Sequence, residues 1–159
     1  MTFEQIQTYL TGLDLGDRIY TFEQSSATVE LAALAVGCEP CKIAKTMSFM
    51  VSDAPILVVL AGDARISNPK FKAQFSQKAK MISPEVVADL TGFPVGGVCP
   101  FMAPNGVKVY LDESLKRFDV VYPAAGTRSS AVKLSIEELE QASKADGWVD
   151  ISKLPEADA

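Results

Sequence analysis

The chain has 159 residues, of which 48% are hydrophobic and 22% charged, and its formal net charge is −5. This composition is typical of a folded protein and predicts a single domain over residues 1–159, with a frayed tail from about residue 154. The longest apolar run, at residues 54–62, is far shorter than the roughly 20 residues that cross a bilayer. The N-terminal region is acidic where a signal peptide is basic and then apolar, so we expect a cytoplasmic protein that does not contact a membrane.

The sequence contains no histidine and three cysteines. The absence of histidine excludes Ser-His and Cys-His nucleophile pairs and metal sites that need imidazole. The odd cysteine count does not fit a disulfide framework and predicts reduced thiols. Cys38 and Cys41 form a Cys-x-x-Cys pair, which suits either a thiol redox pair or half of a zinc site. Both alternatives are disfavoured, because the pair follows a predicted helix C-terminus and only Cys99 remains as a further ligand. We therefore predict no metal and no cofactor.

Hydrophobic periodicity and capping signals predict helices and short strands along the whole chain. Helices are expected at residues 3–11, 29–36, 84–90 and 136–143, with a further helix after residue 68. Strands are expected at residues 18–23, 43–50, 56–61, 107–111, 119–122 and 130–134, with turns at 53–55 and 104–106. The capping residues are Thr2 with Gln5, Thr28 with Gly37, Asn68, Ser83, and Ser135 with Glu138. The strand at 56–61 is apolar enough for burial on both faces, so it and the strand before it should form the sheet centre.

Lys45 is the first candidate functional residue, because it stands in a predicted strand with the apolar Ile43 and Met47 as same-face neighbours. The structural alternative is a lysine whose stem lies along apolar surface while its ammonium stays in water. The functional interpretation is an ammonium held in place to stabilise negative charge on a reacting oxygen.

Residues 91–101 form a loop with three glycines and two prolines, a composition that no regular element tolerates. The loop lacks the Gly-Lys-Ser/Thr of a Walker motif. Its expected use is therefore to present the backbone of Gly96, Gly97 and Val98 close to a ligand. The alternative is a glycine-rich connection without a functional role.

Residues 64–84 contain no acidic residue, although the whole protein is acidic. Five cations lie in this segment: Arg65, Lys70, Lys72, Lys78 and Lys80. They form either a solvated helix face or a local basic patch that contacts phosphate groups.

Six segments match a known family in order and spacing. They are residues 28–33 (TVELAA), 45–49 (KTMSF), 83–86 (SPEV), 90–101 (LTGFPVGGVCPF), 109–115 (VYLDESL) and 124–128 (AAGTR). With these segments the sequence resembles the YbaK/prolyl-tRNA-synthetase-associated editing domain family of aminoacyl-tRNA deacylases. The resemblance implies an α+β fold with a curved, mixed sheet surrounded by helices, and hydrolysis of mischarged aminoacyl-tRNA.

The resemblance also implies roles for individual residues. Lys45 occupies the position of the family's characteristic lysine, and Gly96 begins a match to its Gly-x-x-x-Pro loop. The substrate-binding residues implied by the matching segments are Phe22, Thr28, Pro100, Asp112 and Gly126. For Asp112, the sequence alone also allows a simpler role, as a cap of the turn that follows it. The chain departs from many relatives at Gln24 and from some cysteine-specific members at Ala131, which leaves the amino acid open.

From these features we expect a trans-editing hydrolase that cleaves the ester of a mischarged aminoacyl-tRNA with a small Cys-, Ala- or Ser-type group. Lys45 and the backbone of residues 96–98 would stabilise the developing oxyanion, with help from the terminal ribose hydroxyl. The partners are the 3′ end of aminoacyl-tRNA and, as a further candidate, an aminoacyl-tRNA synthetase. The tRNA-binding candidates are Lys70, Lys72, Lys78 and Lys80. Two alternatives remain: a module that binds an aminoacyl group or amino acid without turnover, and a thiol redox protein that uses Cys38 and Cys41.

Overall fold

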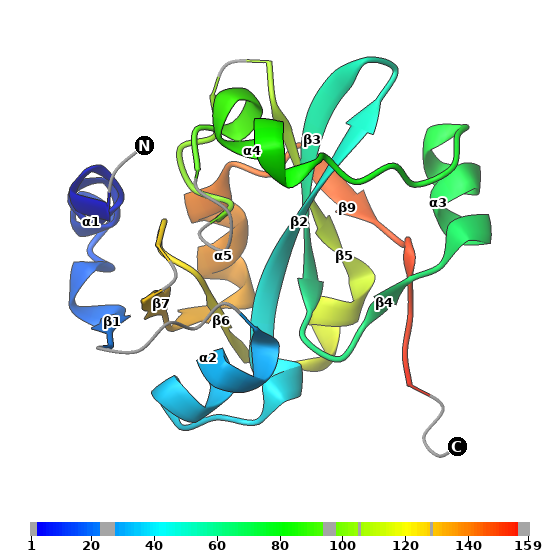
Figure 1. Ribbon diagram of the computed structural model, residues 1–159. Helices are drawn as coiled ribbons and strands as arrows, with labels where there is room; N and C mark the ends of the chain where they lie inside the picture. The colour runs from blue at the N-terminus through cyan, green and yellow to red at the C-terminus, as the bar shows by residue number, and fades with distance from the viewer. Residues whose placement is uncertain (1–2, 23–27, 94–97, 105, 128, 156–159) are drawn as a thin grey trace.

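The computed structural model describes residues 3–22, 28–93, 98–104, 106–127 and 129–155. These residues form an α+β fold in which a curled, mixed sheet is surrounded by helices, as the sequence predicts (Figure 1). The main sheet has the strand order β8-β6-β2-β3-β5-β9. Its strands are β2 (Ile43–Val51), β3 (Ala54–Ala61), β5 (Lys108–Asp112), β6 (Val120–Pro123), β8 (Leu134–Ser135) and β9 (Gly147–Val149).

The strands β2 and β3 form the centre of this sheet, which confirms the sequence prediction. They pair as an antiparallel hairpin in which Lys45 lies opposite Leu60. Their outer neighbours run parallel to them, with β6 beside β2 and β5 beside β3. The β3 residues from Ile56 to Ala61 are at most 5% exposed, so the predicted burial on both faces is confirmed.

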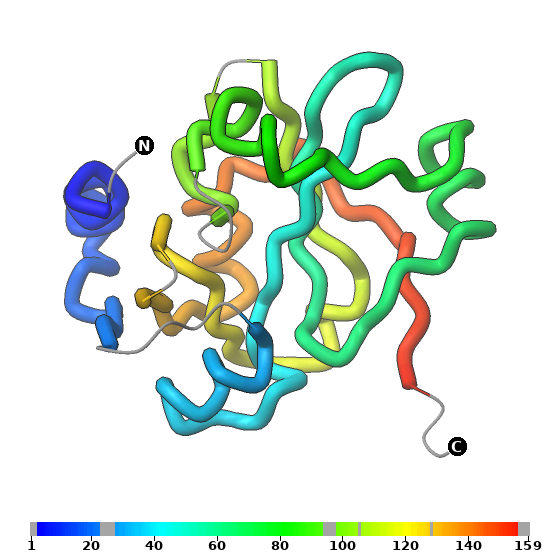
Figure 2. Tube along the Cα trace, in the orientation of Figure 1, coloured from blue at the N-terminus to red at the C-terminus, as the bar shows by residue number. Residues whose placement is uncertain are grey.

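Five α-helices and three short 3-10 helices occur in the described part of the chain. The α-helices are α1 (Phe3–Thr11), α2 (Val29–Val36), α3 (Asn68–Phe75), α4 (Pro84–Thr91) and α5 (Ile136–Ser143). The 3-10 helices are η1 (Gly16–Arg18), η2 (Pro40–Lys42) and η3 (Glu113–Arg117). The helices α1 and α5 lie on one side of the central hairpin, α3 lies on the other, and α2 lies at the end where β2 begins (Figures 1 and 2).

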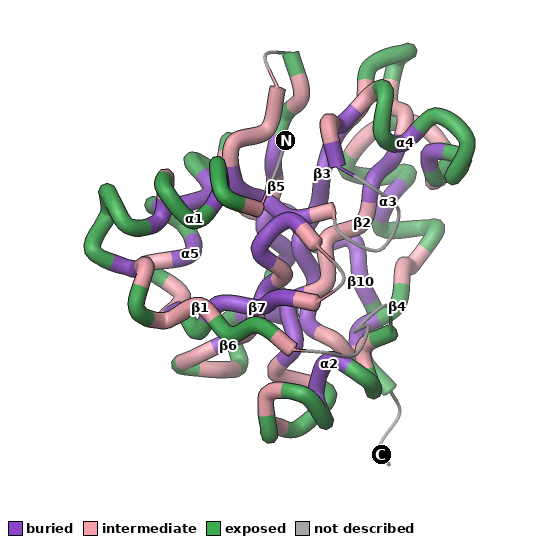
Figure 3. Tube along the Cα trace, turned by 60° about the vertical axis from the view of Figure 1, so that its left-hand side comes forward, coloured by how far each residue is buried: buried purple, intermediate pink, exposed green. Residues whose placement is uncertain are grey.

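Two small antiparallel ribbons flank the sheet. In one, β1 (Ile19–Thr21) pairs with β7 (Ser130–Val132), and in the other β4 (Arg65–Ile66) pairs with β10 (Ser152–Lys153). Buried residues are concentrated along the central strands, while the helices expose one face to solvent (Figure 3). No helix in the described ranges is long and apolar enough to cross a membrane.

The sequence signals for helix ends are confirmed at α2 and α5. The Thr28 hydroxyl accepts a hydrogen bond from the backbone N–H of Leu31, and Gly37 ends α2 with a φ of 76°. Ser135 and Glu138 form the predicted capping box of α5. Both arrangements satisfy backbone groups that a helix end leaves without an intrahelical partner.

The structure corrects two local predictions. Ser67, rather than Asn68, caps α3, because its hydroxyl accepts from the N–H of Lys70 while Asn68 is already helical. The turn between β2 and β3 consists of Ser52 and Asp53, both with positive φ, so β3 begins at residue 54 instead of 56. Two residues of positive φ match the twist of a tight hairpin, which the sequence alone did not reveal.

Other elements are shorter than expected or carry no sequence signal. The strand β1 covers residues 19–21 of the range predicted at 18–23, whose last residue lies outside the described residues. The strands β4, β9 and β10 were not predicted, because alternation cannot be recognised over two or three residues. The predicted capping residue Thr2 also lies outside the described residues.

Candidate active site

Lys45 is half-buried in β2, and its ammonium is held by backbone oxygens. The Nζ atom donates to the carbonyl oxygen of Ala64 at 2.5 Å and to that of Gly62 at 3.4 Å. Burial lowers the pKa of Lys45, the carboxylate of Asp63 acts in the opposite direction, and the guanidinium of Arg65 lowers it further. An ammonium has three N–H donors, and these two contacts within the described residues leave one for a ligand.

The turn between β3 and β4 presents these two carbonyl groups to Lys45. Glycine is required at position 62, because a Cβ atom on Gly62 would overlap the backbone oxygen of Pro40 in η2. The next residue, Asp63, forms a bidentate ion pair with Arg117, with Nη2–Oδ1 and Nη1–Oδ2 distances of 2.5 and 3.1 Å. Packing against η2 and the ion pair to η3 therefore fix the turn that holds the ammonium.

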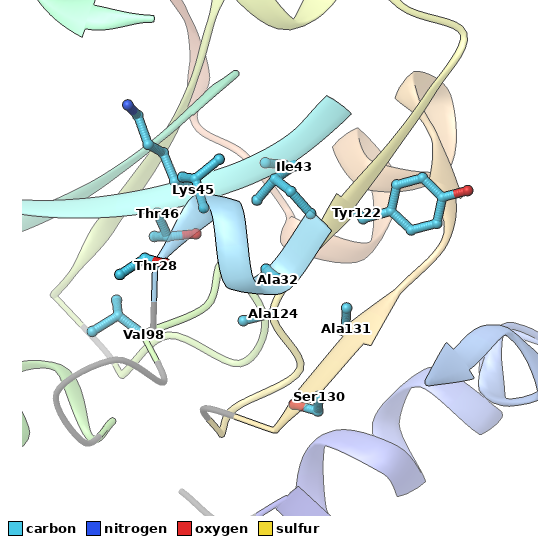
Figure 4. Close-up of a pocket in the computed structure, with 12 residues that line it drawn as sticks. Thr28, Ala32, Ile43, Lys45, Thr46, Val98, Tyr122, Ala124, Ser130 and Ala131 are labelled. Carbon is cyan, nitrogen blue, oxygen red and sulfur yellow. The ribbon is translucent and has the colours of Figure 1, made fainter. Parts of the chain in front are cut away.

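A small cavity of about 170 Å³ lies beside Lys45. We call it the alanine pocket after four of its lining residues, Ala32, Ala44, Ala124 and Ala131. The other lining residues are Thr28, Val29, Ile43, Lys45, Thr46, Val98, Tyr122 and Ser130. In Figure 4, Thr28, Thr46 and Val98 gather at one end, and the Lys45 ammonium points away from the alanines. An apolar cavity of about 150 Å³ accommodates benzene, so this pocket has room for one small side chain.

Thr46 is one of the polar residues that line the alanine pocket. Its hydroxyl oxygen is buried and has no hydrogen-bond partner within the described residues. By contrast, the Ser130 hydroxyl already accepts a hydrogen bond from the N–H of Ala125. Burial of a hydroxyl without a partner costs about 1–3 kcal/mol in proteins, so such an atom needs an explanation. At a position that lines a cavity, a ligand can supply the missing partner.

A second, larger hollow of about 790 Å³ also borders Lys45. We call it the cationic groove; it is lined by Val29, Glu30, Lys45, Gly62, Asp63, Ala64, Arg65, Lys153, Leu154 and Pro155. Val29 and Lys45 line both cavities, so the alanine pocket and the cationic groove meet at the lysine. Three cations line the groove against two acids, and one of these acids, Asp63, is paired with Arg117.

The structure brings three predicted site residues together at the alanine pocket: Lys45, Thr28 and Val98. They come from β2, from the cap of α2 and from the segment after α4, which are distant in the sequence. Gly96 and Gly97, which the sequence groups with Val98, lie outside the described residues. Their predicted contribution to the site stays a prediction.

Phe22, Pro100 and Gly126 are not among the described residues that line the alanine pocket. Phe22 is half-buried, and its backbone N–H donates to the carbonyl oxygen of Ser129 at 3.0 Å. Pro100 is buried, and Gly126 is buried with a φ of 98° against the side chain of Ile6. The contact of these three residues with substrate stays a prediction.

Asp112 is fully buried at the end of β5 and lines neither cavity. Its carboxylate accepts hydrogen bonds from the backbone N–H groups of Ser114 and Ile151, both at 2.9 Å, and from the Ser152 hydroxyl at 2.6 Å. The alternative role as a cap of the following turn is confirmed. The described hydrogen bonds use the Asp112 carboxylate inside the fold, and its implied contact with substrate stays a prediction.

The four predicted tRNA-binding lysines are exposed and lie on α3 or just after it, away from the alanine pocket. Lys70 forms an ion pair with Asp150 at 3.1 Å. Lys72, Lys78 and Lys80 form no ion pair within the described residues. Figure 1 shows α3 at the right edge of the molecule and α2 at its lower end, and contact of these lysines with tRNA stays a prediction.

The cysteines do not favour the redox alternative. Burial raises the pKa of Cys38 and Cys41, and it raises the pKa of the fully buried Cys99 to about 12. A raised pKa disfavours the thiolate that disulfide exchange and metal binding require. All three cysteines are free thiols. Within the described ranges, no group of three His, Cys, Asp or Glu side chains is placed to hold a metal ion.

Several residues of the site escaped the sequence analysis. Thr46 lies inside a quoted motif, but only the structure shows that its hydroxyl lacks a partner. Gly62 follows directly after a buried strand, a position where a glycine signals close backbone approach, and this signal was available. Lys153 lies next to Arg65 only because β10 pairs with β4, and both strands are too short to be predicted from the sequence.

The described site combines three features: the small alanine pocket, the larger cationic groove and a lysine where they meet. Such an arrangement has room for a small group joined to a larger anionic one.

Residues 23–142 match the model of the aminoacyl-tRNA editing domain, and the chain belongs to that family. It is 44% identical over 154 residues to the uncharacterized protein YwhH of Bacillus subtilis (strain 168), covering 96% of this chain and 98% of that protein. It is 29% identical over 111 residues to a proline–tRNA ligase of Listeria monocytogenes serovar 1/2a, covering 69% of this chain but only 19% of the ligase. The crystal structure of a protein proposed as a trans-editing enzyme for prolyl-tRNA synthetase is similar, with a TM-score of 0.83, 28% identity and coverage of 95% and 96%. The family and the fold inferred from the sequence are confirmed.

Proposed function

We propose that this protein is a trans-editing hydrolase that cleaves the ester bond of a mischarged aminoacyl-tRNA. The observation that carries the proposal is the position of Lys45, where the alanine pocket meets the cationic groove. In an aminoacyl-tRNA, a small amino acid is esterified to the terminal ribose of a polyanion, so the ester lies at a matching junction. Family membership and the similarity to a protein proposed as an editing enzyme support the same reaction.

Attack of water on the ester places negative charge on the carbonyl oxygen, and preplaced cations or N–H donors stabilise that charge. We assign this role to the Lys45 ammonium and the backbone N–H of Val98, with Gly96 and Gly97 as predicted contributors. No carboxylate occurs among the described residues that line the alanine pocket. The ribose hydroxyl next to the ester is therefore our candidate for a proton relay, in which it accepts a proton from the attacking water and passes its own proton to the leaving ester oxygen. The products are the free amino acid and a tRNA with both terminal hydroxyls free.

The alanine pocket supports a small aminoacyl group, such as alanyl, seryl or cysteinyl. Its volume of about 170 Å³ and the walls of Ala32, Ala124 and Ala131 suit a single small side chain. The buried hydroxyl of Thr46 adds a preference for a side chain with a polar atom. Similarity to proline–tRNA ligases supports a tRNA specific for proline as the carrier and a synthetase as a partner.

The test is a deacylation screen against alanyl-, seryl- and cysteinyl-tRNA, in which the tRNA is specific for proline or for the cognate amino acid. We expect turnover with at least one substrate, and we expect Lys45→Ala to lower the rate by about a hundredfold or more, the scale of one lost transition-state contact. Lys133→Ala, which removes an exposed lysine outside both cavities, is the matched control. A folded Lys45→Ala protein with the wild-type rate would show that the lysine does not act in the reaction.

The pH dependence gives a second readout of the same lysine. Burial lowers the pKa of Lys45, so the active ammonium is fully present below that pKa and is lost as pH rises through it. Catalysed hydrolysis, corrected for spontaneous ester hydrolysis, should therefore decline at a pH below the ordinary lysine pKa. The residual rate of Lys45→Ala should lack this decline. A wild-type protein that binds every substrate but releases no amino acid would instead identify a binding module.

A further inference from the structure

Arg65 and Lys153 lie directly opposite each other in the antiparallel ribbon of β4 and β10. Like charges at directly opposite positions of two strands destabilise the pairing. Both residues are exposed, and neither forms an ion pair within the described residues, whereas the nearby Lys70 is paired with Asp150. The fold thus keeps two adjacent cations without a counter-charge, an arrangement that a bound anion would relieve.

These two cations line the cationic groove together with Lys45. The groove holds two acids, Glu30 and Asp63, against these three cations, and Asp63 is also paired with Arg117, which does not line the groove. The protein as a whole carries a net charge of −5. The groove is therefore a local positive site on an acidic molecule, and its field depends on a few identifiable side chains.

The size and continuity of the groove suit a chain-like ligand. Its volume of about 790 Å³ lies within the range of about 300–1,000 Å³ typical of ligand sites. Lys153 and Leu154 also line a further hollow that includes Lys70 and Arg117. The alanine pocket and the cationic groove share Val29 and Lys45, and the groove and this hollow share Lys153 and Leu154, so the three lie next to one another.

We propose that the cationic groove binds the phosphodiester backbone of a single-stranded RNA terminus, with Arg65 and Lys153 contacting phosphates next to the ester. The proposal rests on the proposed function, which places an RNA-linked ester at Lys45. A guanidinium can bind phosphate oxygens with two parallel hydrogen bonds, and an ammonium acts as a point charge beside it. Arg65 belongs to the basic segment that the sequence offers as a phosphate-contacting patch, and it is the cation of that segment that lines the groove.

The experiment uses a fluorescently labelled single-stranded RNA of about six nucleotides that ends in CCA and carries no amino acid. Its binding is measured by fluorescence anisotropy over a series of KCl concentrations. The double variant Arg65→Ala/Lys153→Ala should weaken binding about tenfold at low salt. It should also flatten the log-log salt dependence by about 1.4, because each phosphate contact on a single strand contributes about 0.7. The matched control is Lys108→Ala/Lys133→Ala, which removes two exposed cations that line none of the three cavities. It should change affinity less than twofold.

A second readout separates this proposal from the proposed function. Hydrolysis of full-length alanyl-tRNA by the Arg65→Ala/Lys153→Ala variant should fall, whereas hydrolysis of alanyl-adenosine, which has no phosphate, should not. Groove-dependent RNA binding by a wild-type protein without hydrolytic activity would support the groove and refute the proposed function. Failure of the wild-type protein to bind the RNA, equal affinity of the two double variants, or an equal loss on both esters would overturn the groove proposal.

Discussion

Lys45 and Thr46 are neighbours in β2, and each has a hydrogen-bonding group without a partner in the described structure. The Lys45 ammonium is anchored by two carbonyl oxygens and retains one donor, which suits a charge that must be present before the ligand arrives. The Thr46 hydroxyl has no described partner at all, which suits a group that recognises the ligand. The proposed catalytic residue and the proposed residue for substrate selection are therefore adjacent in one strand.

Thr46→Val tests the selection role, because valine keeps the shape of threonine and removes only the hydroxyl. Removal of a buried, unpartnered hydroxyl should raise the free energy of unfolding by up to about 1 kcal/mol. It should also lower the ratio of seryl-tRNA to alanyl-tRNA hydrolysis by about threefold to tenfold, the worth of one neutral hydrogen bond. Urea unfolding and parallel deacylation assays measure the two effects. A destabilised variant with an unchanged ratio would show that the hydroxyl serves the fold.

Single residues differ in how far the sequence reveals them. Lys45 is conspicuous because a charge in an apolar strand violates the local pattern, and the structure explains the violation by two backbone acceptors. Arg65 and Lys153 violate nothing locally, since exposed cations are ordinary on a surface. They become a candidate site only because β4 and β10, which are distant in the sequence, pair and place them opposite each other. A residue is predictable when it conflicts with its own neighbours in sequence, and unpredictable when only the fold creates the conflict.

At the scale of elements, the turn between β3 and β4 joins the core strand to the site. The buried strand β3 ends at Ala61, and the turn supplies both acceptors of the lysine ammonium before β4 enters the ribbon. Gly62 makes the close approach to η2 possible. The strand was predictable from its apolar run, but the turn was not, because its geometry depends on contacts with η2 and η3.

Gly62→Ala should damage both stability and activity. The added Cβ would overlap the backbone oxygen of Pro40, so backbone must shift, at a cost of about 1–3 kcal/mol in the free energy of unfolding. The shift moves the acceptors of Lys45, so hydrolysis per folded molecule should also fall. Gly147→Ala is the control, because a Cβ at that glycine in β9 meets no atom within 4 Å. Denaturant unfolding measures the stability of both variants, and deacylation assays measure their activity. A destabilised Gly62→Ala protein with full activity per folded molecule would show that the turn supports the fold but not the reaction.

At the scale of the whole molecule, Asp112 connects the central sheet to the ribbon that lines the cationic groove. Its carboxylate ends β5, caps η3 through Ser114, and holds the chain entering β10 through Ile151 and Ser152. The sequence could predict the cap, because the turn follows directly. It could not predict the two contacts about 40 residues away, since these depend on the path of the C-terminal segment. Asp112 is therefore linked to the proposed RNA site through Ile151 and Ser152.

Asp112→Asn tests this indirect role. The amide replaces one carboxylate oxygen with an NH₂ group, which would point a donor at the N–H of Ser114 or Ile151. The free energy of unfolding should fall by about 2 kcal/mol or more, as expected for a lost charged hydrogen bond and unsatisfied buried donors. Affinity for the CCA-ended RNA should fall with the loosened ribbon, while hydrolysis of alanyl-adenosine per folded molecule should stay within twofold of the wild type. Asp119→Asn, at an exposed position, is the control and should leave all three measurements unchanged. If hydrolysis of the small ester falls as far as RNA affinity, Asp112 acts on the substrate pocket, and its assignment to the framework of the fold is wrong.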